Sequence, residues 1–489
     1  MNADTSIVTE TTATEAPSAV SEQEATNAGV AGATGILALG NISSRIMGLA
    51  REKTLAYLFG ASAQLDAFRV AVIVPKTFYD LLIGGHVNGA IIPVLSEIVT
   101  IKGRDELWKV VNILLSLLMV SVTGLVLAVL AFAPQIVRLA AGGYDDQTLA
   151  LATSLLRVTT PALIFLSLFA VFSGTLYALK RFTWPAFAGI VFNTSIVAVT
   201  LLLAQTQQIH VNPFGMGFDA ITIERPESAI MAAALGWLIG ALAQMILQLS
   251  ALNIRNIRIT FDWRHPALRR IFLLYLPVMF SLLLDTLVIR FFSYNLASQT
   301  GIEGSLTYMD AATTLIQFPQ GLVATAISVA ILPTLAAQTA LSDDKSQAAY
   351  RDTLGLGLRL AITLIIPAAL GLFVLATPII MLLFQGGEFT SADTLITVQA
   401  LRYYLIGLPF AALDLRLVYA FYARKDTFTP ALIGLFSHGV YIVTVLLLFE
   451  RFSLYSLMLA DSLKHIVHAS ISGVLLHRRL RGFGDQRLL

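Results

Sequence analysis

The sequence predicts an all-α polytopic membrane protein, with about twelve transmembrane helices in two six-helix lobes related by a parallel repeat. Three observations support this: the composition, the succession of apolar spans and an internal repeat. Of the 489 residues, 56% are hydrophobic and 13% are charged, with a mean hydropathy of +0.77. A soluble domain has about 45–50% apolar and about 25% charged residues. The chain has no cysteine, which excludes disulfides and thiolate metal sites.

Apolar spans long enough to cross a bilayer follow one another along the chain. The first set falls at 33–59, 65–98, 107–141, 148–178, 183–206 and 228–254, and the second at 268–298, 305–339, 350–384, 392–422, 428–449 and 452–477. Prolines such as Pro161 and Pro367 interrupt several spans. Such breaks are tolerated where neighbouring helices or cavity water satisfy the freed carbonyls.

The two sets of spans are related. The segment 176–186 (LYALKRFTWPA) aligns with 421–431 (FYARKDTFTPA), and 90–95 (AIIPVL) aligns with 330–335 (AILPTL). The two matches occur in the same order at nearly the same shift, so chance similarity between apolar helices is a poor explanation. Each match keeps its side of the membrane, which predicts a parallel repeat rather than an inverted one.

Basic residues are sorted between the loops. More than half of the 32 Lys and Arg residues fall in the even-numbered loops and the C-terminal segment, whereas the odd-numbered loops carry only Arg138, Arg225 and Arg451. By the positive-inside rule, both termini are expected in the cytoplasm. The expected organisation is a disordered tail (1–32), a first lobe (33–254), a basic linker (255–267), a second lobe (268–477) and a basic tail (478–489).

Charged residues lie inside the first two spans. Five positions of the second span share one helical face because they are spaced 3, 4, 3 and 4 apart: Asp66, Arg69, Ile73, Lys76 and Asp80. The first span carries Arg45, Arg51, Glu52 and Lys53. Charge facing lipid is costly, so this stripe should face protein or a water-filled cavity, which indicates transport of a polar or ionic substrate. The alternative for Lys76 and Asp80 is an i,i+4 ion pair that only stabilises the helix.

Other intramembrane charges allow more than one interpretation. Asp285 could bind a cation or pair with a neighbouring arginine such as Arg290. Asp414 and Arg416 resemble a local structural pair, and Lys53, Arg157, Arg359 and Arg402 are explained by long side chains reaching the interface. Asp461, His465 and His468 share a helical face, where a proton-linked or packing role is favoured over a metal site.

Motifs of soluble enzymes are absent from the sequence. It contains no phosphate-binding loop ending in GK[ST], no HExxH and no GxSxG. We therefore expect a transporter rather than an enzyme, with no nucleic-acid partner, no metal and no organic cofactor.

Several ordered motifs resemble the MurJ/MviN family of lipid II flippases. They are SRIMGLARE at 44–52, LDAF at 65–68, VPKTFYDLLIGGHVNGAIIPVLSE at 74–97, QFPQGLVATAISVAILPTLA at 317–336, FQGGEFTSAD at 384–393 and FYARKDTFTP at 421–430. The resemblance covers almost the whole chain. It implies membership of the multidrug/oligosaccharidyl-lipid/polysaccharide exporter superfamily, a V-shaped two-lobe bundle, alternating access and a lipid-linked peptidoglycan precursor as substrate.

The resemblance also implies roles for particular residues. The family's two first-helix arginines match Arg45 and Arg51, and its acidic residue at the start of the second helix matches Asp66. Family arginines that help bind the pyrophosphate are replaced here by Asp80 and by a residue near Thr314. The family's Asp-Arg pair in the seventh helix reads Ile289-Arg290 here, with Asp285 one turn earlier. Many members have two further helices that form a groove for the lipid tail, whereas this chain ends after the twelfth.

We therefore expect a flippase for lipid II or a close relative in the cytoplasmic (inner) membrane, serving cell-wall synthesis and cell shape. Its substrate-binding residues are expected to be Arg45, Arg51, Arg69, Lys76, Asp66, Asp80 and Arg290, with Asp285 as the site of a coupling ion. A monovalent cation (sodium or proton) or the membrane potential would drive it. Membrane lipids and the cell-wall synthesis machinery are expected partners. The alternatives are export of another lipid-linked oligosaccharide, drug/cation antiport, and a scaffold without transport.

Overall fold

The computed structural model describes residues 19–77, 86–204, 207–209, 221–223, 228–258, 260–273, 289–340, 344–424, 426, 428–480 and 482–483. Within these ranges, helices occupy the positions of the predicted apolar spans. Seven helical segments among the described residues are each long and apolar enough to cross a membrane. The prediction of a helical, polytopic membrane protein is therefore confirmed.

The first lobe is built from the helices that precede the basic linker. They are α1 (Ala19–Phe59), α2 (Ala63–Ala71), α4 (His86–Ile101), α5 (Gly103–Ala131), α6 (Ala133–Ala141), α7 (Asp146–Thr159), α8 (Ala162–Ala178), α9 (Thr183–Leu203) and α10 (Met231–Ser250). Between α9 and α10, strands β1 (Gln207–Ile209) and β2 (Ile221–Ile223) form an antiparallel pair in which Gln208 is opposite Thr222. Pro161 separates α7 from α8, as expected from the proline breaks.

The second lobe follows the linker. Its helices are α12 (Arg290–Ser298), α13 (Ser305–Ala340), α14 (Asp344–Val374), α15 (Ala376–Leu383), α16 (Ser391–Ala423), α17 (Phe428–Phe452) and α18 (Tyr455–Leu480). A capping box at Thr390 and Asp393 begins α16, where each side chain accepts a hydrogen bond from the backbone N–H of the other residue.

Equivalent helices pack in the same way in the two lobes. In the first, α4, α5 and α8 contact one another, and in the second α13, α14 and α16 do so. The pair α9 and α10 corresponds to α17 and α18, with α10 against α8 and α18 against α16. Pro185 is the third residue of α9 and Pro430 the third residue of α17. The packing confirms the parallel repeat.

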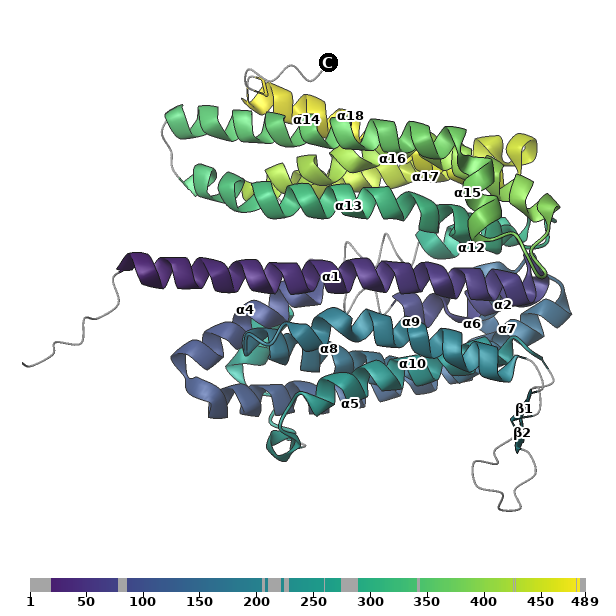
Figure 1. Cartoon of the computed structure of the whole chain (residues 1–489), viewed down its shortest axis with the longest axis horizontal. Coiled ribbons are helices and arrows are strands. Elements are labelled where there is room, and N and C mark those ends of the chain that lie inside the picture. The colour runs from purple at the N-terminus through teal and green to yellow at the C-terminus, as the bar shows by residue number, and fades with distance from the viewer. Residues whose placement is uncertain are drawn as a thin grey trace, which may run out of the picture.

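The two lobes lie one above the other in Figure 1, with α1 running along the boundary between them. The lobes contact each other through α2 with α13, α6 with α12, and α1 with α13. In Figure 1, α2, α6, α7 and α12 lie near one end of the bundle, whereas the start of α1 and the end of α18 lie toward the opposite end. We call the first of these the closed end, formed by the loops 60–62, 142–145, 299–304 and 384–390.

Two segments lie outside the apolar spans: the N-terminal segment before the first span and the basic linker between the lobes. We expected a disordered tail over residues 1–32, but α1 begins at Ala19, so part of that segment is helical. The reason is its content of Ala, Glu and Gln, which are good helix formers; residues 1–18 lie outside the described part of the chain. The basic linker packs on α5, where the Arg258 backbone N–H donates to Asn112 Oδ1 at 3.0 Å.

Candidate functional site

Asp66 joins the two lobes at the closed end. Its carboxylate is completely buried and accepts hydrogen bonds from the backbone N–H groups of Leu306 and Thr307 at 3.3 and 2.9 Å. The hydroxyls of Thr307 and Tyr144 donate to it at 2.8 and 2.6 Å. Because Ser305 begins α13, these backbone groups are unpaired donors of its first turn. An acidic residue of one lobe thus caps a helix of the other, where the helix dipole favours negative charge.

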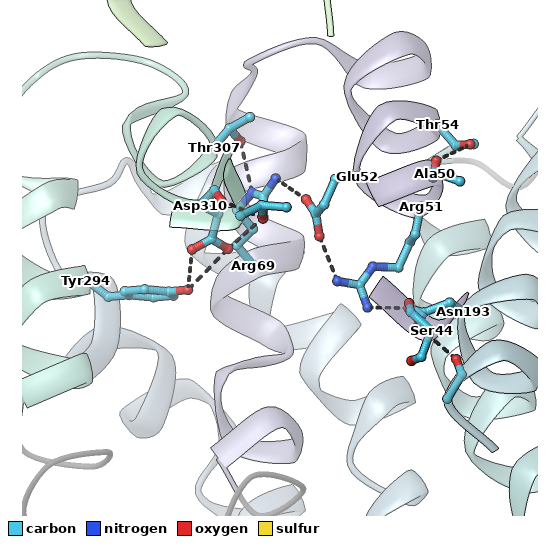
Figure 2. Close-up of polar contacts among 12 residues, drawn as sticks. Ser44, Ala50, Arg51, Glu52, Thr54, Arg69, Asn193, Tyr294, Thr307 and Asp310 are labelled. Atoms are coloured by element: carbon cyan, nitrogen blue, oxygen red, sulfur yellow. Dashed lines mark hydrogen bonds and ion pairs between the residues drawn. The ribbon is translucent and has the colours of Figure 1, made fainter. Parts of the chain in front are cut away.

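Arg69, one turn after Asp66, makes the second connection between the lobes. Its guanidinium donates to Glu52 Oε2 of α1 at 3.0 Å and to Asp310 Oδ2 of α13 at 2.6 Å. It also donates to Thr307 Oγ1 at 3.2 Å. Figure 2 shows Arg69 between the two carboxylates, with Tyr294 beside Asp310. Arg69 is 5% exposed. In this conformation its guanidinium is therefore enclosed by protein and binds protein carboxylates.

The loops of the closed end contact each other closely. The Glu388 backbone N–H donates to Tyr57 O at 2.9 Å, and the Gly143 N–H donates to Ser298 Oγ at 3.0 Å. Gly304 has a φ of +77°, and a Cβ there would lie 2.5 Å from the carbonyl oxygen of Ala61. Only glycine permits both this backbone conformation and this approach. The lobes are therefore in tight contact at this end.

A pocket of about 470 Å³ lies between the lobes. Its wall is formed by α1 of the first lobe and by α13, α14 and α15 of the second: Arg45, Gly48, Leu49, Arg51, Glu52, Thr314, Leu315, Gln317, Phe318, Pro319, Ala368, Leu372, Ile379 and Leu383. Most of these side chains are apolar. The ionic ones are two arginines and one glutamate, so the pocket wall carries net positive charge.

The two arginines are held differently. Arg45 is half-buried and donates to the backbone oxygen of Gln317 across the lobe boundary at 3.0 Å. Arg51 donates to Asn193 Oδ1 at 3.0 Å and to Glu52 Oε1 at 2.7 Å, as Figure 2 shows. Glu52 therefore contacts Arg51 at the pocket and Arg69 at the closed end. A chain of ionic contacts connects the pocket to the junction of the lobes.

The predicted stripe on the second span divides between two environments. Asp66 and Arg69 face the other lobe and are buried in contacts with protein, which is one of the two environments expected for the stripe, because the lobes close over them. Lys76 is half-buried and near enough to Glu52 for an electrostatic interaction. Arg290, the first residue of α12, interacts electrostatically with Tyr294. Asp80 and Asp285 lie outside the described residues, so their roles stay predictions.

Several residues of this arrangement were missed in the sequence. Asp310 lies inside an apolar span, and its charge at that position was a signal of its importance. Tyr144 and Thr307 gave no such signal because hydroxyl residues are common in loops and helix starts. The Asp414 carboxylate, expected to form a local pair with Arg416, contacts His468 of α18 through the His468 Nδ1 and Asp414 Oδ1 atoms. Residues 414 and 416 are two apart and so do not face each other on a helix.

A two-lobe helical bundle with a charged pocket between the lobes is the architecture of a membrane transporter. A solved structure of a lipid II flippase MurJ in an inward closed conformation matches with a TM-score of 0.74, covering 90% of this chain and 87% of that one at 24% identity. An inward-facing multidrug resistance transporter of the MATE family matches with a TM-score of 0.70 at 13% identity, covering 90% and 95% of the two chains. Both matches concern the fold.

Sequence comparisons identify the family. The model of the lipid II flippase MurJ family matches residues 55–489. The lipid II flippase MurJ of Burkholderia cenocepacia is 30% identical over 413 residues, covering 82% of this chain and 74% of that protein. A probable lipid II flippase MurJ of Haemophilus influenzae is 28% identical, covering 89% and 83%. The chain belongs to the lipid II flippase MurJ family and is a transporter rather than an enzyme.

Proposed function

We propose that this protein flips the lipid-linked peptidoglycan precursor lipid II across the cytoplasmic membrane by alternating access. The observation that carries this proposal is the pocket between the lobes, which contains Arg45 and Arg51 and lies beside a closed junction. The names of the relatives support the substrate. A substrate that crosses the membrane through this pocket requires the junction to open, and the contacts of Asp66 and Arg69 would have to break.

The distribution of basic loops supports an orientation with both termini in the cytoplasm. The closed end then faces outward, because it is formed by odd-numbered loops. A precursor synthesised in the cytoplasm would enter the pocket from the inner side in this conformation. We propose multi-pass insertion in the cytoplasmic membrane, with membrane lipids and the cell-wall synthesis machinery as partners.

The pocket suits the anionic headgroup of such a lipid. A pyrophosphate is bound well by guanidinium groups, which donate charge-assisted hydrogen bonds in a planar fork. Arg45 and Arg51 would be the principal donors, with Lys76 and Arg290 as further cations. Thr314 lies in the pocket wall, near the position where the family resemblance implies an arginine, so this chain would depend more strongly on the α1 pair.

The ionic contacts suggest how binding could open the junction. An anion at Arg51 would compete with Glu52 for its guanidinium. Glu52 would then interact more strongly with Arg69, which in turn would bind Asp310 less tightly. Substrate binding and opening would thereby be coupled, as linkage requires of any ligand that favours one conformation.

The driving force is proposed to be the membrane potential or a monovalent cation. Moving one charge across the membrane is worth about 2.3 kcal/mol per 100 mV. Asp285 is the candidate for binding a sodium ion, and Asp285→Asn should then remove any difference between transport in sodium and in sodium-free medium. If transport by the Asp285→Asn variant depended on sodium as much as transport by the parent chain does, Asp285 would be excluded as the sodium-binding residue.

A depletion-and-rescue experiment tests the function. Cells depleted of their own lipid II flippase should grow with normal shape when this chain is expressed. Rescue should fail with Arg45→Ala combined with Arg51→Ala, and persist with Arg402→Ala, an exposed arginine that packs on Phe373 away from the pocket. No rescue by the well-expressed parent chain would contradict lipid II as the substrate. Drug/cation antiport is disfavoured because a cation would meet two arginines and one glutamate in the pocket wall.

A further inference from the structure

A second group of titratable side chains lies inside the second lobe, apart from the interlobe pocket. Helix α18 contributes Lys464, His465 and His468 together with Asp461, and α16 contributes Asp414. His468 contacts Asp414 directly, and Lys464 Nζ lies 2.7 Å from Asp461 Oδ1. We call these five residues the α16–α18 cluster.

His465 lies between the two carboxylates without a hydrogen bond to either. Its Nδ1 is 3.7 Å from Asp414 Oδ2, and its Nε2 is 3.9 Å from Asp461 Oδ2. Both distances exceed that of a hydrogen bond. The Nδ1 atom is buried and has no hydrogen-bond partner in the described part of the chain. An unsatisfied buried polar atom is costly, so an unpaired Nδ1 in a ring that lies between two carboxylates indicates a state that awaits a ligand.

The neighbours of the cluster restrict what that ligand can be. From α17, the Tyr441 ring lies 5.9 Å from Lys464 Nζ, and its hydroxyl is 2.7 Å from Ser293 Oγ of α12. From α16, Tyr404 interacts electrostatically with Asp461, while the Arg416 guanidinium donates to the Ala412 backbone oxygen. His438 of α17 is the remaining half-buried titratable group among the described residues of that helix. The space beside Asp461 is already taken by the Lys464 ammonium.

We propose that the α16–α18 cluster is a proton-binding site of the transport cycle, in which His465 takes up one proton between Asp414 and Asp461. Protonation makes both ring nitrogens donors, and each then faces an acceptor carboxylate. His468 contacts the same Asp414 carboxylate, so a proton at His465 changes the charge that His468 faces. The inference rests on the proposed function for its role in transport, but the site itself does not depend on which lipid is moved.

The site is connected to the junction of the lobes through Tyr404. The Tyr404 hydroxyl interacts electrostatically with both Asp461 and Asp310, and Asp310 binds Arg69 of the first lobe. A proton that binds in the second lobe adds positive charge there. The second lobe then attracts the cationic groups of the first lobe less strongly. Protonation should therefore favour opening of the closed end.

Spin labels across the closed end provide the test, because the chain has no native cysteine. Gln64→Cys and Gln299→Cys place exposed labels on the two lobes. The full chain, reconstituted without lipid II, is measured between about pH 5 and pH 8, the range in which histidine titrates. The long-distance population should grow as the pH falls. The ratio of conformations should change by up to about tenfold per pH unit if one proton binds one conformation.

His465→Gln should abolish this shift, whereas His477→Gln, at an exposed position of the same helix, should retain it. Asp414→Asn keeps the shape of the side chain and should also weaken the shift, which separates proton binding from a packing defect at position 465. The proposal is overturned if the parent chain shows no shift, or if His465→Gln shifts as the parent does. Failure of the rescue experiment alone would overturn lipid II as the substrate and leave the proton site standing.

Discussion

Arg69 of the first lobe and Asp310 of the second form an ion pair in which Nη1 and Oδ2 are 2.6 Å apart. Arg69 is also bound by Glu52, so Asp310→Asn removes one of its two carboxylates and keeps the other. The closed junction should lose about 1.5–3 kcal/mol, the contribution of a hydrogen bond to a charged group. Distances between labels at positions 64 and 299 should then show a larger open population than in the parent chain.

A second contact across the same junction serves as its control. Glu303 accepts from the Ala63 backbone N–H at 3.0 Å, but its side chain is exposed. Glu303→Gln should change the open population little, because glutamine keeps an oxygen that can accept this hydrogen bond and water screens the charge of an exposed carboxylate. Equal effects of Glu303→Gln and Asp310→Asn would show that the buried pair does not hold the lobes together.

Asp66 should stabilise closure by capping α13. Asp66→Asn keeps an acceptor for the Thr307 backbone N–H, but loses the charge and cannot satisfy all the donors around it. A hydrogen bond to a charged group contributes about 1.5–3 kcal/mol against about 0.5–1.5 kcal/mol for a neutral one, so the closed population should fall. Asp145 is the matched control, because it caps its own helix α7 by accepting from Gln147 and Thr148. Asp145→Asn should leave the junction closed and change thermal stability little, because Asn caps a helix about as well as Asp; an unchanged closed population in Asp66→Asn would exclude the capping role.

Most of the fold could be predicted from the sequence because membrane spans are encoded locally. The spans 392–422 and 428–449 agree closely with α16 and α17. The repeat could be recognised at Pro185 and Pro430 because proline is favoured in the first turn of a helix. Its position therefore marks an equivalent helix start in each lobe. The helical start of α1 was missed because composition alone does not separate a polar helix from a disordered segment.

The site was only partly predictable. Helical periodicity placed Asp66 and Arg69 on one face, and the cost of burying charge directed that face toward protein. Periodicity within one helix carries no information about the partner helix. Asp310 and Thr307 could therefore be assigned only from the packing of α2 against α13, and the conformational state of the junction depends on contacts between lobes that a single sequence does not reveal.

Gly321 offers a way to change the pocket without changing a charge. A Cβ at this position would lie 2.5 Å from the Arg45 guanidinium. Because this is the far end of a flexible side chain, Gly321→Ala should displace Arg45 at little structural cost. Alanine is favoured over glycine in a helix by up to about 1 kcal/mol, so α13 itself should not be weakened. Rescue of flippase-depleted cells should decline while the melting temperature is maintained.

Gly371→Ala is the control for this experiment. Gly371 also lies inside a helix of the second lobe, but a Cβ there meets nothing within 4 Å. This variant should rescue fully. If Gly321→Ala rescues equally well, the position of the Arg45 guanidinium is unimportant for transport.

Asp426, in the connection between α16 and α17, should make stability depend on acid pH. Hydrogen bonds from Thr429, with the nearby Arg479 guanidinium, lower the pKa of its carboxyl from 3.8 to about 2. A carboxyl whose pKa is lower in the folded state stabilises the fold above its unfolded pKa, and this contribution is lost as the pH falls toward 2. The melting temperature of the parent chain should therefore fall between about pH 4 and pH 2, and Asp426→Asn should reduce that fall.

The control variant for this measurement of melting temperature against pH is Asp146→Asn, at an exposed position at the start of α7. This variant should show the same acid profile as the parent. An unaltered profile in Asp426→Asn as well would mean that the connection between α16 and α17 does not contribute to acid sensitivity.

The most direct test of the account measures translocation by the purified full chain in vesicles that contain fluorescent lipid II. Translocation should be faster than in protein-free vesicles. It should fall at least about tenfold in the Arg45→Ala, Arg51→Ala double variant, because each lost charge-assisted contact is worth about 1.5–3 kcal/mol. The Arg402→Ala control should translocate as the parent does. A rate no higher than in protein-free vesicles, or one unchanged in the double variant, would contradict lipid II transport through this pocket.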